Sequence, residues 1–106
     1  MKRIYVSLPM KDHEDTVAER YLEAKKKLEE RFKGETIEVV GPCNINEFID
    51  KTFVERNEPW EWFIGEDVKI LLTCTHICMT DGWVASRGCC LEYMLAKHEG
   101  LKILVA

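Results

Sequence analysis

The sequence predicts a three-layer α/β/α sandwich built on a four-stranded, all-parallel sheet. Short apolar segments alternate with longer segments of helical periodicity along the chain, a pattern typical of parallel sheets covered on both faces. Glycine or proline stands between most of these segments and favours sharp element ends. The length of 106 residues fits a single domain, residues 1–106, with one modest core.

Four segments are expected to be strands because they are short, apolar and bounded by turn residues. They are residues 3–7, 36–40, 76–80 and 101–105. Right-handed crossovers between parallel strands leave few topologies. We expect the order 2-1-3-4, which gives a sheet of the Rossmann or flavodoxin-like type.

Three long segments are expected to be helices because apolar residues recur at three- and four-residue spacing. Residues 16–33 carry Val17, Tyr21 and Leu28 on one stripe, and Gly34 follows as a stop. Residues 59–72 begin with a proline, which the first turn of a helix tolerates.

The last long helix, residues 87–99, is expected to turn three apolar side chains inward: Leu91, Met94 and Leu95. A shorter helix is expected within residues 46–53, the least regular part of the chain. No repeat, linker or low-complexity segment interrupts this order.

Composition and charge indicate which kinds of partner and which cell compartment fit the chain. The net charge of −4 weighs against a nucleic-acid binder. No segment approaches the ~18 apolar residues of a membrane helix, and the start of the chain lacks the apolar stretch of a signal peptide. Five cysteines, most of them in apolar runs, indicate reduced thiols in a cytoplasmic protein rather than disulfides.

A ligand site is expected beyond the carboxyl ends of the strands, where doubly wound sheets bind ligands. The loops there are residues 7–10, 41–44 and 81–88. Ser86 can cap the helix that follows, and the free N–H groups of that helix N-terminus suit an anion. Glu92 leans back toward the same crevice. The alternative is that Ser86 only caps the helix and that Glu92 is a solvated carboxylate.

Three pieces of the chain resemble the nucleoside 2-deoxyribosyltransferase-like family, in particular its short, mostly uncharacterised branch. They are IYVSLPM at residues 4–10, the segment 60–72, and GWVASRGCCLE at residues 82–92. The last piece is the most specific because it keeps Gly-x-x-x-Glu where a strand leads into a helix. The branch usually has glycine where this chain has Leu8.

The resemblance implies cleavage or exchange of the N-glycosidic bond of a nucleoside or nucleotide. Glu92 would attack the anomeric carbon and form a covalent glycosyl ester, the logic of retaining glycoside chemistry. Asp67 would orient the sugar and the nucleophile, and Tyr5 would donate a hydrogen bond to the nucleophile. Asp81 is the candidate acid for the departing base.

The same resemblance implies the residues that hold the substrate. Ser86 and Arg87 would bind a sugar hydroxyl or a 5′-phosphate, and Trp83 would stack on the base. The remaining candidates come from the loops after the first and third strands: Ser7, Pro9, Met10, Gly82 and Gly88. The resemblance also implies a homodimer or larger homo-oligomer, and no cofactor.

Two departures from the family weaken the transferase reading. A second aspartate often precedes the nucleophile, but Ser86 stands there in this chain. Family transferases often complete a neighbour's site with a tail, whereas this sequence stops at Ala106. A hydrolase is therefore expected ahead of a transferase. The rival from another class is a non-catalytic nucleotide-binding or sequestering module, and a third option is a structural interaction domain.

Each site residue also has a structural alternative. Tyr5 would simply pack in the sheet, and Asp67 would be a surface charge on its helix. Trp83 would cover the core instead of a base. Arg87 would pair with a nearby carboxylate. The sequence leaves these alternatives open.

Thiol and metal chemistry form the remaining alternatives. Cys74, His76 and Cys78 alternate and would share one face of a strand. No Cys-x-x-Cys pair occurs, and cysteine is a common core residue, so no metal site is expected. Cys89 and Cys90 begin a helix, which is a position that can activate a thiol.

Overall fold

The computed structural model describes all 106 residues, and strands and helices alternate as predicted. Strands β1 to β4 span Lys2–Ser7, Ile37–Val40, His76–Met79 and Lys102–Val105. Helices α1 to α4 span Val17–Arg31, Ile45–Ile49, Trp60–Leu71 and Arg87–His98. Short 3-10 turns precede α1 at Glu14–Thr16 (η1) and α4 at Trp83–Ala85 (η2).

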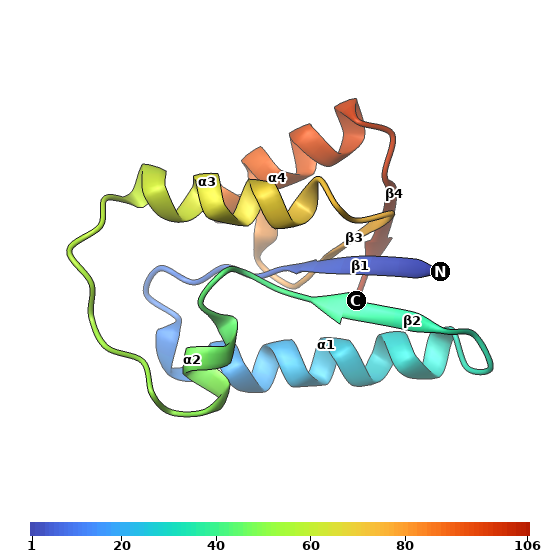
Figure 1. Cartoon of the computed structure of the whole chain (residues 1–106), viewed down its shortest axis with the longest axis horizontal. Coiled ribbons are helices and arrows are strands. Elements are labelled where there is room, and N and C mark those ends of the chain that lie inside the picture. Colours follow the sequence, from blue (N-terminus) through green and yellow to red (C-terminus); the bar gives the residue numbers. More distant parts are fainter.

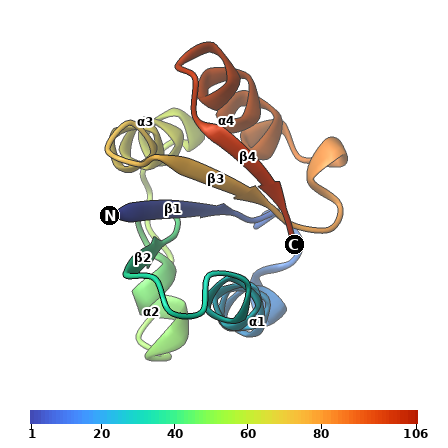
Figure 2. The ribbon, with the colours of Figure 1, turned by 90° about the vertical axis from the view of Figure 1, so that its right-hand side faces the viewer.

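The four strands form one parallel sheet in the order β2-β1-β3-β4, which confirms the predicted order. Helices α3 and α4 cover one face of the sheet, and α1 and α2 cover the other (Figure 1, Figure 2). The register pairs Tyr5 of β1 with Ile77 of β3, and Ser7 with Met79. Because the strands are parallel, their carboxyl ends lie at one edge of the sheet.

The core occupies both faces of the sheet, as expected for buried parallel strands. Side chains of β1 alternate between the two halves of the core. Ile4 and Val6 pack on the side of α1, whereas Tyr5 packs on the side of α3 and α4. All three side chains are fully buried. β1 is therefore the strand on which both layers depend.

Helix α4 presents a different face to the sheet from the predicted one. Leu91 and Met94 are 42% and 64% exposed. The buried face instead carries Cys89, Glu92 and Ala96. The prediction was right for Leu95, which packs against the core, and wrong for Leu91 and Met94. The face toward the sheet is the one that brings Glu92 to the hydroxyls of Tyr5 and Ser7.

Helix α2 is shorter than the predicted segment 46–53 and ends at Ile49. The N–H of Lys51 donates to the carbonyl of Phe48, and the N–H of Thr52 donates to the carbonyl of Glu47. This is the bonding pattern of a Schellman motif, with Lys51 in the left-handed conformation at φ 58°. Because lysine stands where this motif usually has glycine, the sequence did not predict that the helix ends here.

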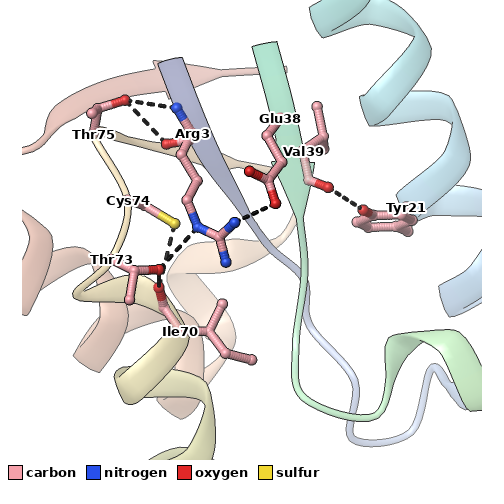
Figure 3. Close-up of polar contacts among 8 residues, drawn as sticks. All are labelled: Arg3, Tyr21, Glu38, Val39, Ile70, Thr73, Cys74 and Thr75. Carbon is pink, nitrogen blue, oxygen red and sulfur yellow. Dashed lines mark hydrogen bonds and ion pairs between the residues drawn. The ribbon is translucent and has the colours of Figure 1, made fainter. Parts of the chain in front are cut away.

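Polar contacts tie the elements together at the amino end of the strands (Figure 3). The N–H of Arg3 donates to Thr75 Oγ1 at 3.0 Å, and its Nε donates to Thr73 Oγ1 at 2.9 Å. The guanidinium also pairs with Glu38 of β2. Arg3 thus links β1 to β2 and to the turn before β3.

None of the helices has the length and apolar content needed to span a membrane.

Gly41, just after β2, lies where Tyr21 of α1 comes closest to that strand. A Cβ atom at position 41 would lie 2.8 Å from Tyr21 Cε1 and 3.3 Å from Ile45 Cγ2. Tyr21 is 6% exposed. Its hydroxyl donates to the carbonyl of Val39 at 3.1 Å, which restricts any movement away from the new atom.

We expect Gly41→Ala to lower the free energy of unfolding by about 1–3 kcal/mol, the usual cost of overpacking a core. Gly65→Ala is the matched control, because a Cβ there meets nothing within 4 Å. The control should stabilise helix α3 by about 0.5–1 kcal/mol. Urea denaturation of both variants checks this, and equal effects would contradict the proposed close approach.

Candidate functional site

A pocket of about 800 Å³ lies at the carboxyl ends of the strands. Its walls come from the loops after β1 and β2, from α3, from the first turns of α4, and from the segment between α2 and α3. This is the position predicted for a ligand in a doubly wound sheet. Its volume is within the ~300–1,000 Å³ that small-molecule sites occupy.

Glu92 lies at the buried end of this pocket and is 3% exposed. Its Oε2 accepts a hydrogen bond from the Tyr5 hydroxyl at 2.6 Å, and its Oε1 accepts one from the Ser7 hydroxyl at 2.7 Å. Tyr5 and Ser7 are two residues apart on β1, so they share one face of the strand. The solvated-carboxylate alternative for Glu92 and the packing-only alternative for Tyr5 are therefore not supported.

The electrostatic environment brings the titration of Glu92 close to neutral pH. Burial raises its pKa from 4.5 to about 7, and the charge of Asp67 adds to the rise. The hydrogen bonds from Tyr5 and Ser7 act in the opposite direction because they favour the charged form. Burial and Glu92 also raise the pKa of Tyr5, which keeps its hydroxyl a donor.

Asp67, on α3, is the only other carboxyl residue of the pocket that is partly buried, because Asp12, Glu14 and Glu55 are exposed. Its Oδ1 accepts the backbone N–H of Cys43 at 2.7 Å, which ties α3 to the loop after β2. Burial raises its pKa, although the hydrogen bond from Cys43 opposes that rise. The charge of Asp67 raises the pKa values of both Glu92 and Tyr5. The protonation of these two groups therefore depends on the charge of Asp67.

The N-terminus of α4 forms another wall, as the sequence predicts. Ser86 Oγ accepts the N–H of Cys89 at 3.3 Å, so this serine caps the helix. Gly82 turns the chain at φ 82° before the helix begins. Both residues line the pocket together with Arg87 and Gly88. Free helix N–H groups and a guanidinium make this wall suitable for an anion.

Arg87 does not make the carboxylate pair that was its structural alternative. Its guanidinium instead lies 4.0 Å over the ring centre of Trp60. This cation–π contact orients the charged group beside the pocket. From the loop after β1, Pro9 and Met10 also line the pocket, while Ser7 lies beneath it, against Glu92.

Four predicted site residues do not line the pocket: Tyr5 and Ser7 lie beneath it against Glu92, and Asp81 and Trp83 lie outside it. Asp81 is exposed and Trp83 is half-buried, and neither lines the pocket. Trp83 packs against Tyr93 of α4, with ring centres 4.7 Å apart. Trp83 thus covers the core, which is the structural alternative given for it above.

Sequence reasoning missed several residues that line the pocket. Four are aromatic: Phe48, Phe53, Trp60 and Phe63. Asn44 also lines it and is only 9% exposed. Asn44 stands at the N-cap of α2, yet its side chain does not cap that helix. Its place just after β2 was the only sequence signal, whereas the aromatic residues looked like ordinary core positions.

The thiol and metal alternatives gain no support. Burial raises the pKa of Cys43 to about 12 and also raises that of Cys89, the reverse of thiol activation. Cys74 lies before β3 and packs on the α3 and α4 side, while Cys78 packs on the α1 side. The predicted shared face is wrong because only two of the three residues belong to the strand.

These features define a class: a parallel α/β domain with a buried carboxyl held by two hydroxyls at the end of a ligand-sized pocket. Over residues 2–105 the chain matches the family described as Domain of unknown function (DUF4406), and it belongs to that family. No curated protein and no solved structure is significantly similar to it. The likeness to nucleoside 2-deoxyribosyltransferases stays a prediction from the sequence.

The raised pKa of Glu92 predicts a specific dependence of stability on pH. Between pH 4.5 and about 7 the folded chain holds a proton that the unfolded chain releases, so stability falls as pH rises through this window. The loss approaches about 3 kcal/mol. Glu92→Gln removes this titration, so the variant should gain stability relative to the parent between pH 5 and pH 8.

Urea denaturation of both chains at the two pH values measures this difference. Glu99→Gln is the control, because Glu99 is exposed just after α4. Its stability should follow that of the parent at both pH values. Parallel pH curves for the parent and Glu92→Gln would contradict a raised pKa for Glu92.

Proposed function

We propose that the protein cleaves the N-glycosidic bond of a nucleoside or nucleoside 5′-monophosphate, with Glu92 as the nucleophile. The observation that carries this proposal is the buried Glu92 carboxyl, held by Tyr5 and Ser7 at the end of a ligand-sized pocket. The same residues are the ones that the family resemblance assigns to the nucleophile and to its tyrosine partner.

The proposed reaction has two steps, as in retaining glycoside hydrolysis. A Glu92 oxygen attacks the anomeric carbon, the bond to the base breaks, and its electron pair leaves with the base nitrogen. Water then attacks the anomeric carbon of the glycosyl ester and passes a proton to the group that protonated the base, which releases the sugar and restores the Glu92 carboxylate. Hydrolysis is proposed ahead of transfer to a second base, and no cofactor takes part.

The departing base needs a proton, and Asp67 is the better candidate to supply it. It lies in the same pocket as Glu92, and burial raises its pKa, which is the direction that a proton donor requires. Asp81 is exposed and outside the pocket. Asp67 therefore replaces Asp81 as the proposed acid.

The substrate is proposed to lie between the N-terminus of α4 and the aromatic wall, the name used here for the four aromatic residues that line the pocket: Phe48, Phe53, Trp60 and Phe63. Ser86, Arg87 and the free N–H groups of α4 suit a sugar hydroxyl or a 5′-phosphate. Trp60 and Phe63 offer apolar surface for the base in place of Trp83. Free cysteines and a small nucleotide substrate are compatible with a cytoplasmic location. Homo-oligomer formation stays a prediction.

A non-catalytic nucleotide-binding module is the second candidate. It is favoured by the pKa of about 7 for Glu92, because near neutral pH much of the population holds a neutral carboxyl. Such a carboxyl can hydrogen-bond to a ligand without attacking it. Turnover therefore distinguishes the two candidates.

We expect base release from at least one member of a panel of ribonucleosides, deoxyribonucleosides and their 5′-monophosphates. Glu92→Gln should lower the rate by about 10³-fold or more, because the amide cannot form the glycosyl ester. Chromatography detects the free base, and calorimetry measures binding. Binding without base release would support the sequestering module, and the absence of both would leave neither candidate.

Tyr5→Phe tests the positioning of the nucleophile. Loss of a hydrogen bond to a charged group costs about 1.5–3 kcal/mol, so kcat should fall by roughly 10- to 100-fold. The pKa of Glu92 should also rise, because its Tyr5 hydrogen bond now lowers it, and the pH optimum should move upward. Tyr21→Phe, which removes a hydroxyl bonded to the carbonyl of Val39 outside the pocket, is the control. An unchanged pH optimum in Tyr5→Phe would contradict the role.

A further inference from the structure

Residues 52–59, here called the strap, connect α2 with α3. The strap contains no helix or strand, and each of its residues is exposed. Backbone hydrogen bonds involve only its two ends, at the N–H of Thr52 and the carbonyl of Pro59. It passes from the α2 layer to the α3 layer along the edge where the strands end (Figure 1). Such a segment can move while both helices stay in place.

One side of the strap forms part of the pocket wall. Phe53, Glu55 and Arg56 line the pocket together with Asp67 and Glu92. A ligand that reaches Glu92 therefore lies beside the strap. Movement of the strap would change the access of ligand and water to the buried carboxyl.

Two side-chain contacts hold the strap to α2. The ring of Phe53 stacks on Phe48, with centres 4.3 Å apart and planes inclined by 19°. Arg56 pairs with Glu47, and the two side chains are 37% and 27% exposed. An ion pair this open to water contributes little to stability and is easily exchanged. Lys51, at φ 58°, marks the point where the chain leaves α2.

Lys11 and two arginines line the pocket, and the arginines differ in how firmly they are held. Arg87 belongs to α4, and its guanidinium is stacked on Trp60. Arg56 lies on the strap, 6.0 Å from the ring centre of Trp62, and its charge pairs with Glu47. Of the two arginines, Arg56 is therefore the one that can leave its partner for an anionic ligand without disturbing a helix.

We propose that the strap is a gate over the pocket and that the Glu47–Arg56 pair is its latch. When a ligand carries a phosphate into the pocket, Arg56 exchanges Glu47 for that phosphate and the strap closes. The identity of the ligand, a nucleoside 5′-monophosphate, rests on the function proposed above. The latch itself does not depend on any reaction at Glu92.

Trypsin cleavage after Arg56 tests the latch, because the protease must take the arginine away from Glu47. Cleavage in the native state follows the population of molecules in which Arg56 is bound neither to Glu47 nor to a ligand. We expect Glu47→Gln to speed cleavage at least fivefold, with no matching increase at the lysines of α1. Glu23→Gln, which removes an exposed pair with Lys27, is the control and should leave the rate unchanged. Equal rates in Glu47→Gln and the parent would overturn the latch, and faster cleavage at every site would mean general unfolding and would also overturn it.

Adenosine 5′-monophosphate and adenosine test the exchange, in the Glu92→Gln background so that turnover cannot consume them. We expect saturating nucleotide to slow cleavage after Arg56 about tenfold, and the nucleoside less than twofold. Absent protection by the nucleotide, or equal protection by both, would overturn the exchange. Protection of Glu92→Gln, together with no base release by the parent protein, would retain the gate and reject the proposed hydrolase, so the two failures are distinguishable.

Discussion

The architecture of the pocket depends on the burial of one carboxyl group. Placing an ionisable carboxyl in a protein interior costs several kcal/mol unless hydrogen bonds replace water. Here Tyr5 and Ser7 supply those bonds to Glu92 from the central strand. The strand must therefore turn two polar groups toward α4 at the place where apolar side chains would pack best. The order β2-β1-β3-β4 places β1 inside the sheet, where neither hydroxyl reaches solvent.

The same burial makes the carboxyl chemically responsive. Solvent exclusion raises the pKa of Glu92 to about 7, while its two donors hold it below the value that burial alone would give. Asp67 adds a second negative charge through the pocket. That charge favours the protonated form of Glu92, so it acts in the same direction as burial.

Much of the fold could be predicted from the sequence because it depends on local patterns. Alternating apolar segments predicted the parallel sheet and its order, and Ser86 predicted the start of α4. Failures occurred where a tertiary contact decides the outcome. The face of α4 depends on the hydroxyls that satisfy Glu92, and these lie about 85 residues away along the chain. The aromatic wall and Asn44 face the pocket only because α2, α3 and the strap meet there.

The two ends of the sheet differ in a way that separates stability from binding. At the amino end, the contacts of Arg3 with Thr73, Thr75 and Glu38 join three segments that are distant in sequence. At the carboxyl end, the pocket has a floor built from the rigid centre of the sheet, while one of its walls has almost no backbone hydrogen bonds. Ligand access can therefore change without disturbing the hydrogen bonds that hold Glu92. Such a site holds the Glu92 carboxyl in place, while the strap is free to change position as a ligand enters.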